Sequence, residues 1–226
     1  MKSRQEIKLQ AKTNMGKQRA TAVLITLAVF VVSFVLGLFG FIPLIGWIIS
    51  LFSSLLSLVL SVNMSGEYIK IYRGEQASVG EVISKCSVNF LRKVGGMLWM
   101  ALFAVLWSML LWVPGIIKMY AYRMAPYILA ECPEVNAKEA LKLSMRMTNG
   151  HKGKLFVADL SFIGWILLSS LTLYILLLFH VGPYMYTTMA GYYAELKKEA
   201  LEKGVIRPEE FGGSRVEEVR LTGQEN

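Results

Sequence analysis

Long apolar runs alternate with short charged segments along the 226 residues of this chain. A helix needs roughly 20 apolar residues to cross the hydrocarbon core of a bilayer. Four stretches of about this length contain no Asp, Glu, Lys or Arg, namely residues 20–42, 44–66, 94–117 and 160–180. This pattern predicts membrane-crossing helices rather than the strands of a soluble core, so we expect an all-α membrane protein.

Proline-containing turns divide these stretches into pairs of helices. The turns GFIPLIGW, LWVPGI and FHVGPY contain Pro43, Pro114 and Pro183. Proline is tolerated in the first turn of a helix, where its missing N–H removes no hydrogen bond. We therefore predict about six transmembrane helices, arranged as three proline-turn hairpins. The expected helices are residues 20–42, 43–64, 95–113, 114–132, 155–180 and 183–195.

The fourth and sixth of these helices are the least typical. Residues 114–131 contain Lys118 and Arg123, and residues 183–195 offer few apolar positions before Glu195. A short apolar segment must thin the bilayer, be shielded by neighbouring helices or enter the membrane without crossing it. Five spans therefore remain an alternative to six.

Basic residues gather in the segments between the hairpins. Of the 24 Lys and Arg residues, 22 lie in the N-terminus, residues 70–93, residues 138–154 and the tail. Positively charged loops stay on the cytoplasmic side of a membrane. We therefore expect a multi-pass plasma-membrane protein with both termini in the cytoplasm. The net charge of +8 then reflects membrane topology and not binding to nucleic acid.

A polar helix is expected before each hairpin. Three capping boxes or close variants mark the starts of these helices: Ser3-x-x-Glu6, Ser78-x-x-Glu81 and Asn136-x-x-Glu139. After the second box, SVGEVISKCSVNFLRKV (residues 78–94) carries an apolar stripe at helical spacing. We predict a capped, amphipathic cytoplasmic helix at each of the three positions.

The same order, a capped polar helix followed by a hairpin, recurs three times. It predicts one integral membrane domain over residues 1–203, with possible repeats at 3–73, 78–132 and 136–203. The alternative is that a six-span protein alternates loops and spans without any repeat. Residues 204–226 mix charges with glycine, and we expect them to form a disordered cytoplasmic tail.

Cations beside the polar helices are candidate contacts with anionic inner-leaflet lipids or with a protein partner. Each basic side chain near an anionic surface contributes on the order of 1 kcal/mol to membrane binding. The candidates are Lys85, Arg92, Lys93, Lys142, Arg146, Lys152 and Lys154. The alternative is that these residues only anchor the helices and set their topology.

Two ionisable residues inside the predicted spans form a candidate pair. Arg123 lies nine residues after Pro114, near the expected midplane, and Asp159 lies in the fifth span. A charge at the bilayer centre costs roughly 3 kcal/mol or more, so Arg123 needs a partner or water. We predict an Arg123–Asp159 ion pair that holds helices together. A polar pathway through the membrane is the alternative.

Serines recur along one face of the second span, at Ser50, Ser54, Ser57 and Ser61. Small residues on one face allow two helices to approach closely. We interpret this face as a helix-packing surface, with a polar solute route as the alternative. Asn63 and Glu67 continue near this face toward the cytoplasm.

Signatures of catalysis and metal binding are missing from the sequence. It contains no GxSxG, HExxH or P-loop motif. Cys86 and Cys132 are too far apart for a paired motif, and His151 and His180 lack metal-ligand spacing. We therefore expect neither an enzyme nor a cofactor or metal site.

The segment from residue 114 onward resembles a known family. It contains PGI, APYILAE followed closely by proline, NGHKGKLF and LSFIGW, and GPYMYTTMAGYYAEL follows in the sixth predicted span. These stretches resemble domain-of-unknown-function family 975, a group of bacterial, mostly Gram-positive, multi-pass membrane proteins. The resemblance covers roughly residues 1–196. It implies a membrane location but no activity and no catalytic residues.

The sequence therefore predicts only a broad class of function. The favoured role is a membrane-organising, envelope-stress or immunity-type component, in contact with the lipid bilayer and with a second copy or another membrane protein. A small-solute transporter and the membrane partner domain of an enzyme are the alternatives. Transporters usually break their helices at the membrane midplane, whereas the breaks predicted here lie at the outer turns.

Overall fold

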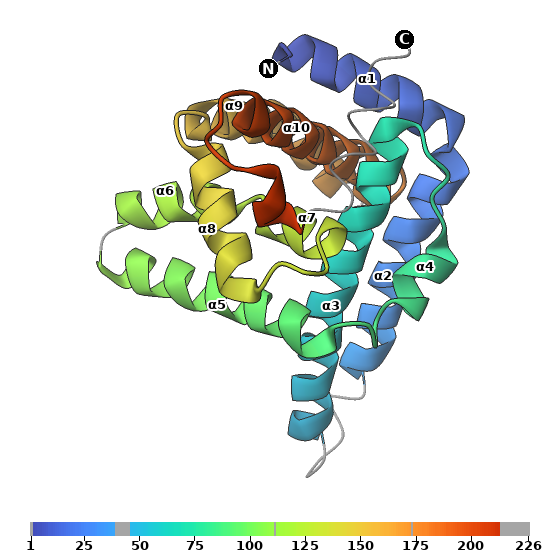
Figure 1. The fold of residues 1–226 in the computed structure, drawn as a ribbon. Coiled ribbons are helices and arrows are strands. Elements are labelled where there is room, and N and C mark those ends of the chain that lie inside the picture. The colour runs from blue at the N-terminus through green and yellow to red at the C-terminus, as the bar shows by residue number, and fades with distance from the viewer. Residues whose placement is uncertain (1, 39–45, 111, 173, 213–226) are drawn as a thin grey trace.

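The computed structural model describes residues 2–38, 46–110, 112–172 and 174–212, and contains helices but no strand within these ranges (Figure 1). This confirms the predicted all-α class. In chain order the helices are α1 (Arg4–Lys17), α2 (Arg19–Leu38), α3 (Gly46–Arg73), α4 (Val79–Ser84), α5 (Phe90–Leu110), α6 (Trp112–Tyr122), α7 (Ala125–Glu131), α8 (Ala137–Thr148), α9 (Lys152–Leu171), the π-helix η2 (Leu177–Val181), α10 (Gly182–Glu202) and the 3-10 helix η3 (Pro208–Phe211).

Helices lie side by side in three places: α2 with α3, α5 with α6, and α9 with the continuous run of η2 and α10. Each pair is antiparallel, because residues early in one helix contact residues late in the next. The contacts are Thr26 with Tyr68, Ser33 with Ser57, Phe103 with Tyr122, Trp107 with Lys118, Phe162 with Tyr184 and Trp165 with His180. In Figure 1 α5 runs across α3, so the helix pairs extend from the core in different directions.

The core forms where the C-terminal half of α3 meets α1, α7 and α10. Helix α1 contributes the buried stripe Ile7, Ala11 and Met15. Buried tyrosines provide much of the rest, and two pairs of rings stack across helices, Tyr68 on Tyr186 and Tyr127 on Tyr193. Stacked rings add roughly 1 kcal/mol beyond the area that they bury. The apolar face of α1 is therefore covered by protein.

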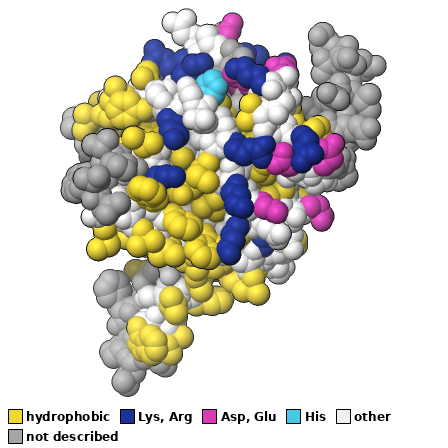
Figure 2. All heavy atoms as spheres, turned by 60° about the vertical axis from the view of Figure 1, so that its left-hand side comes forward, with side chains coloured by type: hydrophobic (Ala, Val, Ile, Leu, Met, Phe, Trp, Pro, Cys, Tyr) yellow, Lys and Arg dark blue, Asp and Glu magenta, His cyan; other side chains and the backbone are white. Residues whose placement is uncertain are grey.

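Four helical segments are long and apolar enough to cross a membrane, counting only described residues. They are Arg19–Leu38, Gly46–Arg73, Phe90–Trp107 and Lys152–Ser170. Large apolar side chains on these segments are exposed, among them Phe34, Leu51, Leu102 and Leu167. Figure 2 shows hydrophobic side chains spread over the left and lower parts of one face, with most basic side chains above and beside them.

The predicted fourth span, residues 114–132, is broken into α6 and α7. Helix α6 has 11 residues, a length of about 16 Å, which is shorter than the hydrocarbon core. Pro126 explains the break, because its ring would clash with the carbonyl group of Tyr122 if α6 continued. The hydroxyl of Ser144 in α8 binds both sides of the break. It donates to the Ala121 carbonyl (2.8 Å) and accepts from the Met124 N–H (3.1 Å).

The predicted sixth span, residues 183–195, lies inside the protein. Helix α10 buries Thr187, Met189, Tyr192 and Tyr193, and is not among the four membrane candidates. The third proline turn is wrong as predicted, because Pro183 lies within a continuous helical run from η2 into α10. The wider π-helical turn before Pro183 accommodates a ring that would clash in a regular helix.

The other two proline turns are described only in part. Pro114 is the third residue of α6, and α5 ends at Leu110, so a proline does lie in the first turn of this return helix. Pro43 lies outside the described residues.

The predicted helix over residues 78–94 is wrong, because two helices replace it. Helix α4 ends at Ser84, Asn89 has a left-handed φ of 53°, and α5 begins at Phe90. The Ser78 side chain forms no cap hydrogen bond. The Glu81 carboxylate binds Lys70 and Lys85 instead of completing the predicted capping box. The box at Ser3 is formed in full, and at Asn136 the Glu139 carboxylate accepts a hydrogen bond from the Asn136 N–H.

The prediction of a disordered tail is wrong for residues 204–212. Ile206 and Phe211 are buried in the core, and Phe211 is the last residue of η3. The Arg146 guanidinium binds the Glu210 carboxylate and the Val205 carbonyl group, which ties this segment to α8. The predicted tail beyond Gly212 lies outside the described residues.

Gly191 in α10 allows a close approach that a larger residue would prevent. A Cβ atom there would lie 2.4 Å from a ring atom of Tyr72 and 2.8 Å from Ile7. We expect Gly191→Ala to lower the free energy of unfolding by about 1–3 kcal/mol, because the core must expand. Denaturation of the purified chain in a mild detergent measures this.

Gly164→Ala is the matched control, since a Cβ atom there meets nothing within 4 Å. Alanine is the better helix former, so this variant should keep or slightly raise the stability. Equal stability of the two variants would contradict the close packing at Gly191.

Candidate functional site

A polar cleft of about 710 Å³ opens between the C-terminal half of α3, the connection from α4 to α5, and the end of α7. Its volume lies within the range of small-molecule sites. The lining residues are Asn63, Gly66, Glu67, Ile69, Lys70, Arg73, Glu75, Glu81, Lys85, Val88, Asn89, Arg92, Lys93, Leu129, Ala130, Glu131 and Pro133. The cations in this set outnumber the carboxylates by one.

One end of the polar cleft is electrically balanced. Lys70 Nζ lies 3.0 Å from Glu67 Oε1 and 2.8 Å from Glu81 Oε2, and Lys85 also pairs with Glu81. The second oxygen of Glu67 accepts a hydrogen bond from the Ser78 N–H. Hydrogen bonds from Lys70 and Lys85 lower the pKa of Glu81 to about 2. Two lysines and two glutamates therefore pair with one another at this end of the cleft.

Glu131 anchors the opposite wall. Its carboxylate lies 2.5 Å from Arg73 Nη2, 2.7 Å from Lys197 Nζ and 2.5 Å from the Tyr193 hydroxyl. Burial alone would raise the pKa of Glu131. The charges of Lys197 and Arg73, with hydrogen bonds from Lys197 and Tyr193, outweigh burial and hold this pKa at about 2. One ionised side chain of α7 thus joins α3 and α10.

The middle of the cleft holds two cations with neutral partners. Lys93 is 5% exposed, and its Nζ donates to Asn63 Oδ1 (2.6 Å) and to the Lys85 carbonyl group (2.8 Å). The Arg92 guanidinium donates to three carbonyl groups near the end of α7, those of Leu129, Cys132 and Val135. No carboxylate of the described residues forms a salt bridge with either side chain.

The structure divides the seven predicted lipid or partner contacts into two groups. Lys85, Arg92 and Lys93 come together at the polar cleft. The other four do not line it, since Lys142 and Arg146 lie on α8 and Lys152 and Lys154 at the start of α9. Arg146 is engaged with Glu210 of the C-terminal segment, so its contact within the described residues is internal.

Arg123 and Asp159 lie together. Arg123 Nη2 is 3.0 Å from Asp159 Oδ1, and the Tyr120 hydroxyl donates to Asp159 Oδ2 at 3.1 Å. Both charged side chains are partly exposed. The pair joins the break after α6 to α9. Lys8 of α1 donates to Ser161, two residues beyond Asp159, so the polar contacts continue to the N-terminal helix.

The four serines of α3 do not form one interface. Ser57 Oγ lies 3.1 Å from Ser33 Oγ of α2, which is a contact between helices. Ser54 and Ser61 bond to carbonyl groups of their own helix, and Ser50 and Ser54 are exposed. The N-terminal half of α3, which carries the exposed Ser50 and Ser54, extends beyond the core (Figure 1). The predicted packing face is therefore limited to Ser57.

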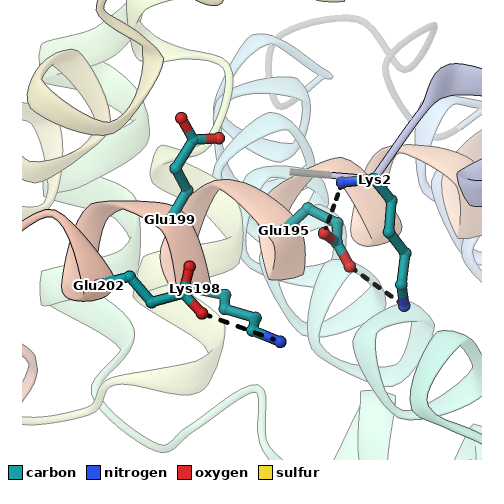
Figure 3. A pocket seen from close by; sticks show the side chains of 5 residues that line it. All are labelled: Lys2, Glu195, Lys198, Glu199 and Glu202. Carbon is teal, nitrogen blue, oxygen red and sulfur yellow. Dashed lines mark hydrogen bonds and ion pairs between the residues drawn. The ribbon is translucent and has the colours of Figure 1, made fainter.

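A second, smaller pocket of about 300 Å³ lies beside α10 (Figure 3). Glu195 accepts a hydrogen bond from the Lys2 backbone N–H and forms an ion pair with the Lys2 side chain. Lys198 Nζ lies 3.9 Å from Glu202 Oε1. Figure 3 shows Glu199 extending away from Lys2. Its carboxylate pairs with His151 and Lys203. The charges of this pocket are thus engaged with one another.

The thiols are poorly suited to nucleophilic chemistry. Burial raises the pKa of both, and for Cys132 it reaches about 11. The thiolate is the reactive form of cysteine, so both side chains are protonated at neutral pH. Among the described residues, no three His, Cys, Asp or Glu side chains gather to hold a metal ion.

Sequence reasoning missed Glu131 and Ser144 as organising residues. Glu131 ends the apolar stretch APYILAE, and a charged residue next to so many apolar ones was the signal that could have identified it. Its partners Arg73 and Lys197 are 58 and 66 residues away along the chain. Pro126 was the available signal for the break after α6.

Loss of the Glu131 charge should destabilise the fold. Glu131→Gln leaves the buried Lys197 and the partly buried Arg73 without this counter-charge, which costs about 3 kcal/mol. The pH dependence has a definite sign. A carboxylate with a lowered pKa stabilises the fold above its ordinary pKa, and this stabilisation is lost as the pH falls toward 2. The native chain should therefore lose stability more steeply than Glu131→Gln between pH 4.5 and 3.

Chemical denaturation in detergent across this pH range measures both effects. Parallel pH profiles for the native chain and Glu131→Gln would contradict the lowered pKa. Comparison with the variant removes the contributions of other carboxylates, because these are common to both chains.

Arg123 and Asp159 should be energetically coupled. A double-mutant cycle with Arg123→Gln and Asp159→Asn is expected to give a coupling energy of about 1 kcal/mol, because the side chains are in contact but partly exposed. Unfolding of the four chains in detergent measures it. Additivity within about 0.3 kcal/mol would show that the pair does not stabilise the fold.

Comparison with known proteins gives one result. The sequence matches the family described as "Protein of unknown function (DUF975)" over residues 1–121 and 109–200. No curated protein and no solved structure matches the chain. The two matched segments together cover most of the sequence and include every helix that lines the polar cleft. The chain therefore belongs to the DUF975 family.

Proposed function

We propose that this chain is a multi-pass plasma-membrane protein without enzymatic activity, which serves as a membrane-organising, envelope-stress or immunity-type component. The observation that carries the proposal is the separation of two surfaces. Exposed apolar side chains cover α2, α5, α9 and the N-terminal half of α3. The ion pairs of Glu67, Glu81 and Glu131 gather at the opposite end of α3.

This separation suits a protein of which one part contacts lipid and the other part contacts water. Apolar side chains that water would disfavour are stable against lipid, and ion pairs are stable at a hydrated surface. With the basic segments in the cytoplasm, both termini and the polar cleft lie on the inner side. Helices α7 and α10 belong to this inner-side core, while α6 enters the membrane region under the cover of neighbouring helices. The rigid cytoplasmic core then offers a surface to a second copy or to another membrane protein.

A small-solute transporter is the second candidate, and one observation favours it. The chain breaks between α6 and α7 beside the Arg123–Asp159 pair. Transporters place discontinuous helices and charged residues at their substrate sites. However, Ser144 and Pro126 account for the break by themselves, and Asp159 already has two partners. The organising role therefore remains the stronger proposal.

Labelling of single cysteines in intact cells tests the topology. In a background with Cys86 and Cys132 replaced, Trp47→Cys, Met109→Cys and Ile175→Cys lie near the far ends of the three helix pairs. All three positions are exposed. A membrane-impermeant maleimide should label them from outside the cell, because the proposal places these ends beyond the membrane.

Lys138→Cys, at the exposed start of α8, is the control and should react only after the cells are permeabilised. Protection of one outer position would remove that helix pair from the membrane-crossing set. Labelling of Lys138→Cys from outside would invert the proposed orientation.

A further inference from the structure

The central cations of the polar cleft lack the counter-charges that its two ends possess. Lys70 and Lys85 face Glu67 and Glu81, and Arg73 faces Glu131. Lys93 is almost completely buried and meets an amide oxygen and a carbonyl oxygen instead. Burial of a charge without an opposite charge is unfavourable. An anion beside Lys93 would remove this penalty.

The start of α5 makes the same place more positive. Its first turn contains no acidic residue, and both Arg92 and Lys93 lie within it. The N-terminus of a helix carries a partial positive charge, so cations there are disfavoured and anions are stabilised. Arg92 Nε is buried and has no hydrogen-bond partner. The charges of Arg92 and Lys93 and the dipole of α5 therefore all favour an anion on this side of the cleft.

Apolar side chains border the positive region. Val88 lines the cleft and is 53% exposed, and the neighbouring Leu91 is 82% exposed. Phe90, between them, begins one of the four candidate membrane spans. A ligand with a phosphate and an adjoining apolar part would meet complementary chemistry on both sides of this edge. Basic pockets at the cytoplasmic ends of membrane helices bind lipid headgroups in this way.

We propose that the polar cleft binds a phosphate group beside Lys93 and Arg92, at the N-terminus of α5, with Lys85 as a further cation of the same cleft. The phosphate belongs either to a phospholipid headgroup or to a soluble phosphomonoester. Phosphate supplies the negative charge that the cleft lacks and accepts several hydrogen bonds at once. The lipid source rests on the proposed membrane location, whereas the binding of phosphate itself does not.

Calorimetric titration of the full-length chain in a neutral detergent tests the proposal. Phosphatidic acid in mixed micelles is compared with diacylglycerol, which has the same acyl chains without phosphate. Glycerol 3-phosphate is compared with glycerol, and inorganic phosphate is titrated alone. Saturable binding of phosphatidic acid only identifies a lipid ligand. Binding of glycerol 3-phosphate or inorganic phosphate identifies a soluble one, and either result supports the site.

Variants locate the binding. Lys93→Gln should weaken it about tenfold or more, as expected when a hydrogen bond between charged groups is lost. Lys93→Arg should retain most of the affinity. Lys142→Gln removes an equal charge from exposed α8 and should have no effect. Thermal unfolding verifies that each variant is folded.

If Lys93→Gln does not fold, Lys85→Gln decides the matter. Its half-exposed side chain reaches the same cleft, and its loss should weaken binding severalfold. The proposal is overturned if no phosphate-bearing probe binds saturably, or if the folded cleft variants bind as tightly as the native chain. Since these titrations need no membrane orientation, their failure would leave the topology experiment unaffected.

Discussion

The buried carboxylate of Glu131 is the interaction on which the arrangement of the core depends. It binds Arg73 of α3, and Lys197 and Tyr193 of α10, while its own helix α7 follows the break at Pro126. A buried carboxylate is stable only when its charge is matched and its oxygens accept hydrogen bonds. Because all three partners must be in place, this one residue sets the positions of α3, α7 and α10 together.

The polar cleft is a consequence of that arrangement. Glu131 holds Arg73 against one wall, and Arg92 binds the last carbonyl groups of α7, which fixes the start of α5 on the other side. The α4–α5 connection and the first turn of α5 then place Lys85 and Lys93 between the two walls. The contacts that stabilise the core thus leave a polar space in which cations outnumber carboxylates by one. The same α5 continues from this space into an apolar helix, so the cleft lies where the two surfaces of the protein meet.

The places of the exposed apolar side chains and of the buried ion pairs follow one rule, which is that each group needs surroundings that match its polarity. The exposed apolar side chains of α2, α5 and α9 are unfavourable in water, whereas the ion pairs need a hydrated surface or close partners. At the α6–α7 break, backbone groups form hydrogen bonds with the hydroxyls of Ser144 and Thr148 in α8. Irregular backbone near a membrane requires such internal partners. Helix α8, polar by sequence, therefore acts as a structural support for the interior.

The sequence by itself determined the all-α class, the approximate positions of four long apolar helices, the capping box at Ser3 and the contact of Glu139 with the Asn136 N–H. These features depend on residues within a few positions of each other, so local pattern suffices to identify them. Only the tertiary structure decided that Glu81 leaves its capping box, that Pro183 lies within a helix, and that Lys85, Arg92 and Lys93 meet Glu131 at one cleft. The cleft joins segments distant in the chain, which local pattern does not reveal. Glu81 is drawn to Lys70 and Lys85, whose charges outweigh the local preference for a cap, and the wider π-helical turn before Pro183 accommodates the proline ring.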